Sequence, residues 1–73
     1  MTVFTDLPAV QLYVGGGISP RRGKGGAAYG RNSALCLETQ FYPDSPNHPE
    51  FPSTILRAGE VFRSKTSYKF ETE

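Results

Sequence analysis

Polar and apolar residues alternate along several short segments of the chain, with the period of two that β-strands show. The alternation predicts strands over residues 2–5, 10–14, 34–42 and 60–71, and a further short strand over residues 53–56. Glycine- and proline-rich stretches separate these segments, and none of them carries apolar residues at helical spacing. The chain is therefore predicted to be all-β, with four or five antiparallel strands.

The segment over residues 34–42 is the longest apolar stretch, and it carries Glu38 in its middle. Because side chains alternate across a strand, Glu38 and Gln40 are predicted to share one face, while Leu37 and Thr39 share the other. Glutamate is depleted in strands, and a carboxylate removed from water is costly unless it is paired. Glu38 is accordingly a candidate general base if it borders a cavity. The alternatives are exposure to solvent or an ion pair with an arginine.

The neighbouring predicted strands also have two distinct faces. In residues 10–14, Gln11 and Tyr13 lie opposite the aliphatic side chains. Residues 60–71 are predicted to form one strand, or two with a break near Lys65. The outer face is largely basic, and the inner face is predicted to carry Phe62, Ser64, Thr66, Tyr68 and Phe70.

A glycine-rich and basic segment over residues 15–26 has some features of a phosphate-binding loop. A P-loop needs four residues between its first glycine and the Gly-Lys pair, and then a serine or threonine. Here five residues separate Gly17 from Gly23, and Gly25 follows Lys24. No helix is predicted after the segment to present its N-terminus to an anion. We interpret the segment as a flexible connection between strands.

Proline recurs at every third position from Pro43 to Pro52, which matches the repeat of a polyproline II helix. Peptides of this form bind aromatic grooves, usually with basic flanks, but the neighbours here are Asp44 and Glu50. We therefore expect a stiff crossing between strands, with a proline-rich docking module as the alternative. The single histidine, His48, lies in this segment. One histidine and one cysteine do not form a paired ligand motif, so no metal is expected.

Composition limits the classes of function further. The chain has 73 residues, one cysteine and a net charge of +1. It can therefore form one small domain without an internal disulfide, and its balanced charge implies no nucleic-acid partner. No stretch is long enough to cross a bilayer, and the first residues do not resemble a signal peptide. Four or five strands would leave open edges and one apolar face, which predicts a partial domain over residues 1–73 that completes a larger sandwich.

Several motifs resemble the C-terminal part of the aldose 1-epimerases, also called galactose mutarotases. The likeness runs through nearly the whole chain in order. It is carried by Val10-Gln11-Leu12-Tyr13, Gly23-Lys24-Gly25-Gly26, Cys36-Leu37-Glu38-Thr39-Gln40, Tyr42-Pro43-Asp44, Pro49-Glu50-Phe51-Pro52, Ile55-Leu56-Arg57, Gly59-Glu60 and Ser67-Tyr68-Lys69-Phe70.

This resemblance implies a galactose-mutarotase-like β-sandwich that interconverts the α and β anomers of hexoses such as galactose and glucose. It places the catalytic base on Glu38 and a sugar-binding side chain on Gln11. It also implies a hexose substrate, no cofactor, no membrane partner and a cytoplasmic location. In this family a histidine protonates the ring oxygen while the glutamate takes the proton of the anomeric hydroxyl.

The chain departs from the family pattern in what it lacks. The family's acid and sugar-orienting histidines lie in an earlier region, and His48 occupies a loop position where the family often has glutamine. The chain is therefore expected to carry the base without the acid, to need the missing N-terminal part, and to be inactive alone. The alternative is a non-catalytic carbohydrate-binding or interaction fragment.

Overall fold

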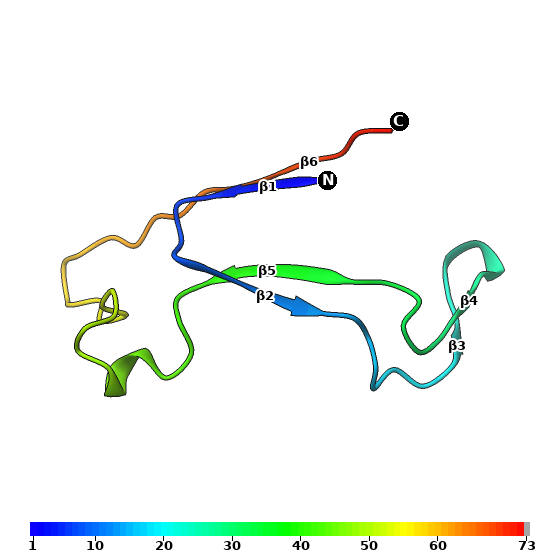
Figure 1. Cartoon of the computed structure of the whole chain (residues 1–73), viewed down its shortest axis with the longest axis horizontal. Coiled ribbons are helices and arrows are strands. Elements are labelled where there is room, and N and C mark those ends of the chain that lie inside the picture. The colour runs from blue at the N-terminus through cyan, green and yellow to red at the C-terminus, as the bar shows by residue number, and fades with distance from the viewer. Residues whose placement is uncertain (73) are drawn as a thin grey trace.

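In a computed structural model the chain is built from short β-strands and two 3₁₀ turns, and the structure describes residues 1–72 (Figure 1). The turns cover Lys24–Gly26 and Ser45–Asn47. The strands are β1 (Thr2–Thr5), β2 (Ala9–Tyr13), β3 (Arg21–Arg22), β4 (Ala28–Tyr29), β5 (Cys36–Gln40) and β6 (Thr66–Lys69). Within residues 1–72 no helix is long and apolar enough to cross a membrane.

The strands pair into three two-stranded antiparallel sheets, β1·β6, β2·β5 and β3·β4. Figure 1 shows β1·β6 and β2·β5 as two layers, with the β3·β4 hairpin at one end and the proline-rich segment at the other. The prediction of an all-β chain with antiparallel strands is therefore confirmed.

Hydrogen bonds join the two layers directly. The Thr66 hydroxyl on β6 lies 2.7 Å from that of Thr39 on β5 and 3.2 Å from that of Thr5 on β1. The Tyr68 hydroxyl donates to the main-chain carbonyl of Leu37 at 2.8 Å. Leu37 and Thr39 are half-buried, so the face of β5 predicted to be the less polar one lies toward β1·β6.

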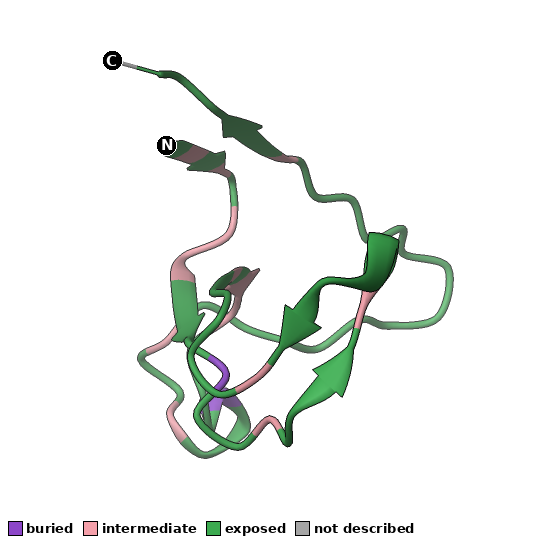
Figure 2. Ribbon diagram, turned by 90° about the vertical axis from the view of Figure 1, so that its right-hand side faces the viewer, coloured by how far each residue is buried: buried purple, intermediate pink, exposed green. Residues whose placement is uncertain are grey.

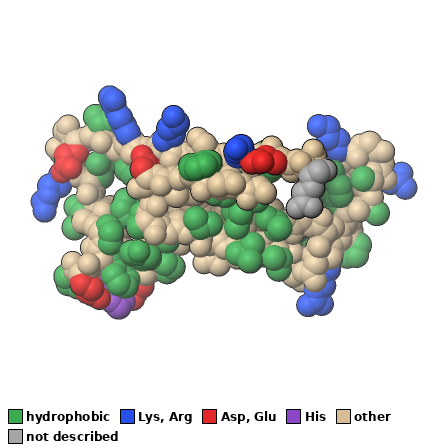
Figure 3. Space-filling view, turned by 45° about the horizontal axis from the view of Figure 1, so that its top comes forward, with side chains coloured by type: hydrophobic (Ala, Val, Ile, Leu, Met, Phe, Trp, Pro, Cys, Tyr) green, Lys and Arg blue, Asp and Glu red, His purple; other side chains and the backbone are tan. Residues whose placement is uncertain are grey.

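The two layers do not enclose a hydrophobic core. No hydrophobic side chain in residues 1–72 is buried, and most of the ribbon in Figure 2 is exposed. Ile55 is 67% exposed and Phe70 is 75% exposed, and Figure 3 shows hydrophobic side chains reaching the surface over much of the molecule. An open hollow of about 570 Å³ next to β5 is lined by apolar groups of Met1, Leu35, Cys36, Leu37, Tyr68 and Phe70. Surface of this kind normally lies against further protein.

The glycine-rich segment is more ordered than a flexible connection. β3 and β4 pair within it, and Gly25 and Gly26 turn the chain between them with φ of 66° and 80°, a conformation that glycine adopts at little cost. The Tyr29 hydroxyl accepts a hydrogen bond from the Lys24 amide, and the Tyr29 ring covers Gly23 so closely that a Cβ there would overlap it. The prediction of a flexible connection over residues 15–26 is therefore wrong for residues 21–26.

Two strand predictions in the last third of the chain need correction. Residues 53–56 form no strand, because the Ile55 amide turns back to the Ser53 hydroxyl and no described strand lies beside them. Of residues 60–71 only Thr66–Lys69 is a strand. Its partner β1 ends at Thr5, opposite Thr66, because the turn over residues 6–8 leads the chain away. A strand needs a partner for its main-chain groups, and local alternation does not provide one.

The proline-rich segment is not a polyproline II helix over its whole length. Asp44 has a left-handed φ of 61°, and the 3₁₀ turn Ser45–Asn47 follows it. Side-chain hydrogen bonds stabilise this turn, with the Ser45 hydroxyl donating to the Tyr42 carbonyl and the Asn47 amide donating to Asp44. These short polar side chains form local hydrogen bonds, one to the main chain and one between side chains, and override the proline spacing.

Candidate active site

The two candidate site residues are cross-strand partners. β2 and β5 pair with Gln11 directly opposite Glu38, between the pairs Leu12–Leu37 and Val10–Thr39. Directly opposed residues of an antiparallel pair project to the same face, with Cβ atoms roughly 4.5–5.5 Å apart. The sheet therefore brings a carboxylate and a carboxamide together from two segments that are distant in the sequence.

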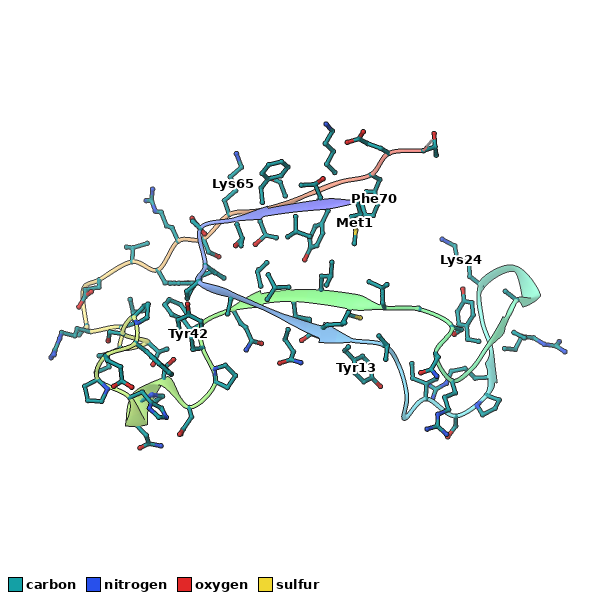
Figure 4. All side chains as sticks on the ribbon, viewed as in Figure 1. Met1, Tyr13, Lys24, Tyr42, Lys65 and Phe70 are labelled. Carbon is teal, nitrogen blue, oxygen red and sulfur yellow. The ribbon has the colours of Figure 1, made fainter. Side chains whose placement is uncertain are left out.

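The face that carries this pair is turned away from β1·β6. Figure 4 shows Tyr13 projecting from β2 to the side opposite β1 and β6, and Gln11 and Glu38 share the face of Tyr13 by strand alternation and pairing. We call this surface the polar face, and it consists of Ala9, Gln11, Tyr13, Cys36, Glu38 and Gln40. The sequence had placed Gln11 with Tyr13 and Glu38 with Gln40, and the pairing unites the two sets.

Glu38 is exposed on the polar face and borders none of the main hollows of the described chain, which agrees with the alternative of exposure to solvent and not with a carboxylate beside a cavity. None of the ion pairs within residues 1–72 involves Glu38, so the alternative of an arginine partner finds no support there. Gln11 is also exposed, and its side-chain amide donates to the Leu12 carbonyl at 3.1 Å. Both side chains are therefore accessible to a ligand approaching the polar face.

His48 belongs to a separate cluster in the proline-rich segment. Its Nε2 lies 3.1 Å from an Asp44 oxygen and its Nδ1 lies 3.2 Å from a Glu50 oxygen, while its ring stacks on Phe51 at a centroid distance of 4.7 Å. The two carboxylates contact opposite ring nitrogens and so cannot converge on one ion. Within residues 1–72 no three His, Cys, Asp or Glu side chains form a group that could hold a metal.

The polar face supports one half of an acid–base reaction. A carboxylate can accept a proton, and a neighbouring carboxamide can bind a hydroxyl as donor or acceptor. Ring opening of a cyclic sugar also needs a proton donor at the ring oxygen, and the single histidine is engaged elsewhere. The arrangement is suited to binding a polyhydroxylated ligand and to removing one of its protons.

Sequence reasoning did not identify the contacts that β6 makes beneath the polar face. Thr66 bonds Thr39 and Tyr68 bonds Leu37, the two residues that flank Glu38. The alternation of residues 60–71 did place both side chains on an inner face. It could not show which residues that face would meet, because the partner is set by the packing of two sheets.

Comparisons with known proteins place the chain in a family. The model of the aldose 1-epimerase family matches residues 1–69. Galactose mutarotase of Mus musculus is 46% identical over 71 residues, which are 96% of this chain and 21% of the mouse protein. The human galactose mutarotase is 44% identical over the same share of both chains, and aldose 1-epimerase of Escherichia coli is 41% identical over 75 residues.

The chain spans about a fifth of the length of the curated relatives it matches. No solved structure matches it. The family model nonetheless matches nearly every residue of this chain, including the strands that carry Gln11 and Glu38. The chain belongs to the aldose 1-epimerase family.

Proposed function

We propose that this chain supplies the general base and one sugar-binding side chain of an aldose 1-epimerase that acts on hexoses. The observation that carries the proposal is the direct pairing of Gln11 with Glu38 on an accessible face of β2·β5, in a chain of this family. Glu38 is the base and Gln11 is the substrate-binding residue. The relatives' names, galactose mutarotase and aldose 1-epimerase, support a hexose as the substrate class.

In the proposed reaction Glu38 accepts the proton of the anomeric hydroxyl, and Gln11 hydrogen-bonds a hydroxyl of the same sugar. An acid from outside these 73 residues protonates the ring oxygen, so that the ring opens. The aldehyde end then rotates, and closure on its other face gives the second anomer. A general acid and a general base each contribute roughly 10²- to 10⁴-fold, so the chain alone is inactive in this proposal.

The lack of a core supports a second part of the proposal, that residues 1–73 form part of a larger sandwich. The apolar hollow next to β5 and the unburied hydrophobic side chains need a cover that two small layers cannot provide. The remaining part of a full-length family member is the cover that we propose. A cytoplasmic location is consistent with Cys36, an exposed free thiol in the structure.

The test compares this chain alone with a chimera. Residues 1–73 replace the matched segment of mouse galactose mutarotase, and a second chimera uses Escherichia coli aldose 1-epimerase. Polarimetry of freshly dissolved α-galactose measures mutarotation. We expect both chimeras to accelerate it, and the isolated chain to leave the spontaneous rate unchanged. Acceleration by the isolated chain would show that the acid is not missing, and two folded but inactive chimeras would argue against the function.

A second candidate function is sugar binding without catalysis. It is favoured by one observation, that the β2·β5 pairing already places Gln11 and Glu38 together within these 73 residues. Titration of the isolated chain with galactose, followed by NMR, separates the two candidates. Saturable chemical-shift changes at Gln11 and Glu38 would support sugar binding by the isolated chain. Unchanged spectra would mean that the chain binds sugar only as part of the chimera.

A further inference from the structure

Side chains of β6 contact β5 on the face opposite to the Glu38 side chain. Tyr68 donates its hydroxyl to the carbonyl of Leu37, which belongs to the peptide group joining Leu37 to Glu38. Thr66 bonds the hydroxyl of Thr39, the next residue along the strand. Both supporting side chains come from β6 and stand two residues apart, on one face of that strand. The residues on either side of Glu38 are thus held by one neighbouring strand.

Thr5 on β1 joins Thr66 and Thr39 in the same set of hydrogen bonds. The Thr66 hydroxyl also lies 3.2 Å from that of Thr5, which in turn accepts a hydrogen bond from the Leu7 amide at 3.1 Å. Thr5, Thr39 and Thr66 are half-buried, although most residues around them are exposed. A hydroxyl has one proton to donate and two lone pairs, so Thr66 can bond both neighbours at once.

We propose that Thr66 and Tyr68 are positioning residues for Glu38. This inference rests on the proposed function, since it assigns them a role through the base. Neither side chain reaches the polar face, because both contact β5 from its opposite side. Instead they fix the height and twist of β5 at Glu38, where residues 1–72 provide no buried hydrophobic side chain to do so. A base must be held within about 0.5 Å of its productive geometry, and rigid main-chain support provides that precision.

The test removes each hydroxyl without changing the size of the side chain. Tyr68→Phe and Thr66→Val are made in the active chimera, and kcat and KM are measured well below the melting temperature. We expect kcat to fall roughly three- to tenfold, with KM within about twofold, because misplacement of a catalytic group acts on the chemical step. Thr66→Ser keeps the hydroxyl and should restore most of the lost kcat.

Matched controls separate position from general stability. Tyr29→Phe also removes a tyrosine hydroxyl that bonds the main chain, but in the β3·β4 hairpin, and Thr2→Val removes an exposed hydroxyl on β1. Both controls should leave kcat unchanged. Rates are corrected for the folded fraction, measured by circular dichroism, because partial unfolding lowers kcat without changing KM.

A double-mutant cycle gives the deciding result. In a Glu38→Gln background the base is absent, so Thr66→Val and Tyr68→Phe should cause no further loss of the residual rate. If Thr66→Val and Tyr68→Phe lowered the rate by the same factor with and without Glu38, their roles would be structural only. That result would overturn the inference. Normal turnover of Glu38→Gln itself would overturn the proposed function instead, so the two failures are distinguishable.

A measurement that does not use activity keeps the inference testable in any folded chimera. The amide order parameter of Glu38, from ¹⁵N relaxation, should fall below the value of about 0.85 that marks a rigid main chain when Tyr68 becomes phenylalanine. An unchanged value in both hydroxyl variants would contradict the inference. Tyr68→Phe changes one atom of a half-exposed ring, so it remains usable if Thr66→Val does not fold.

Discussion

Two regions of the molecule are stabilised over very different distances along the chain. In the proline-rich segment, residues 43–52, the hydrogen bonds of Ser45, Asn47 and His48 all join residues that are two to four positions apart. In the layered strands, Thr5 bonds Thr66 across 61 positions, and Tyr68 bonds Leu37 across 31. The proline-rich segment builds its own local structure, whereas the polar face exists only when distant segments meet.

This difference explains where function is expected. The His48 cluster contains two carboxylates and a histidine, but its members contact each other and form no group within residues 1–72 that could hold a metal. The polar face has a single carboxylate, yet it presents Glu38 and Gln11 side by side and open to solvent. Substitutions in the two regions should therefore affect different quantities, catalysis in one and stability in the other.

The largest effect is expected at Glu38. Glu38→Gln keeps the shape of the side chain and removes its ability to accept a proton, so kcat of the chimera should fall roughly 10²- to 10⁴-fold. Polarimetry measures the loss, and an unchanged melting temperature serves as the control. A variant with near-normal turnover would mean that another group is the base.

A smaller effect is expected at Gln11. Gln11→Ala removes hydrogen bonds to a neutral sugar hydroxyl, and kcat/KM should fall roughly tenfold, which corresponds to about 1.4 kcal/mol. The loss should appear mainly in KM if the contact is equally strong in the ground state. Ser64→Ala, at another exposed polar residue, is the matched control. Unchanged kcat/KM would remove Gln11 from the site.

Ser45→Ala tests the local region. Ser45 is 7% exposed and is the buried polar side chain of residues 1–72, and its hydroxyl bonds the Tyr42 carbonyl. The loss should lower the free energy of unfolding of the chimera by about 1 kcal/mol, because the part-buried hydrogen bond to the Tyr42 carbonyl is lost. Chemical denaturation measures the change, while kcat stays as it was. A loss of kcat in fully folded protein would show that the two regions are coupled.

The smallest effect is expected at His48. His48→Gln removes two contacts to exposed carboxylates, and exposed pairs of this kind contribute less than about 1 kcal/mol. With the imidazole protonated, the change in unfolding free energy should shrink further in high salt, which screens surface charges. Mutarotation should be unchanged. If His48→Gln abolished turnover in a folded chimera, the histidine would belong to the reaction after all.

Where strands formed, the sequence correctly predicted which side chains share a face. Gln11 and Tyr13 share a face, as do Glu38 and Gln40, and Thr66 and Tyr68 both contact β5 from the inner face of β6. The predictions failed where alternation occurred without a partner, over residues 53–56 and 60–65, and where polar side chains formed a turn within the proline repeat. Period-two alternation reports which residues share a face, but pairing requires a second strand.

By itself, the sequence determined the all-β class and the family, because these depend on local periodicity and on motifs of adjacent residues. The family resemblance also named Glu38 and Gln11 as the candidate base and sugar-binding residue. Only the tertiary structure decided that Gln11 stands opposite Glu38 and that Thr66 and Tyr68 hold the strand beneath. The physical reason is strand register. A shift of one residue between β2 and β5 would turn one of the two side chains to the other face, and nothing in either strand alone sets that register.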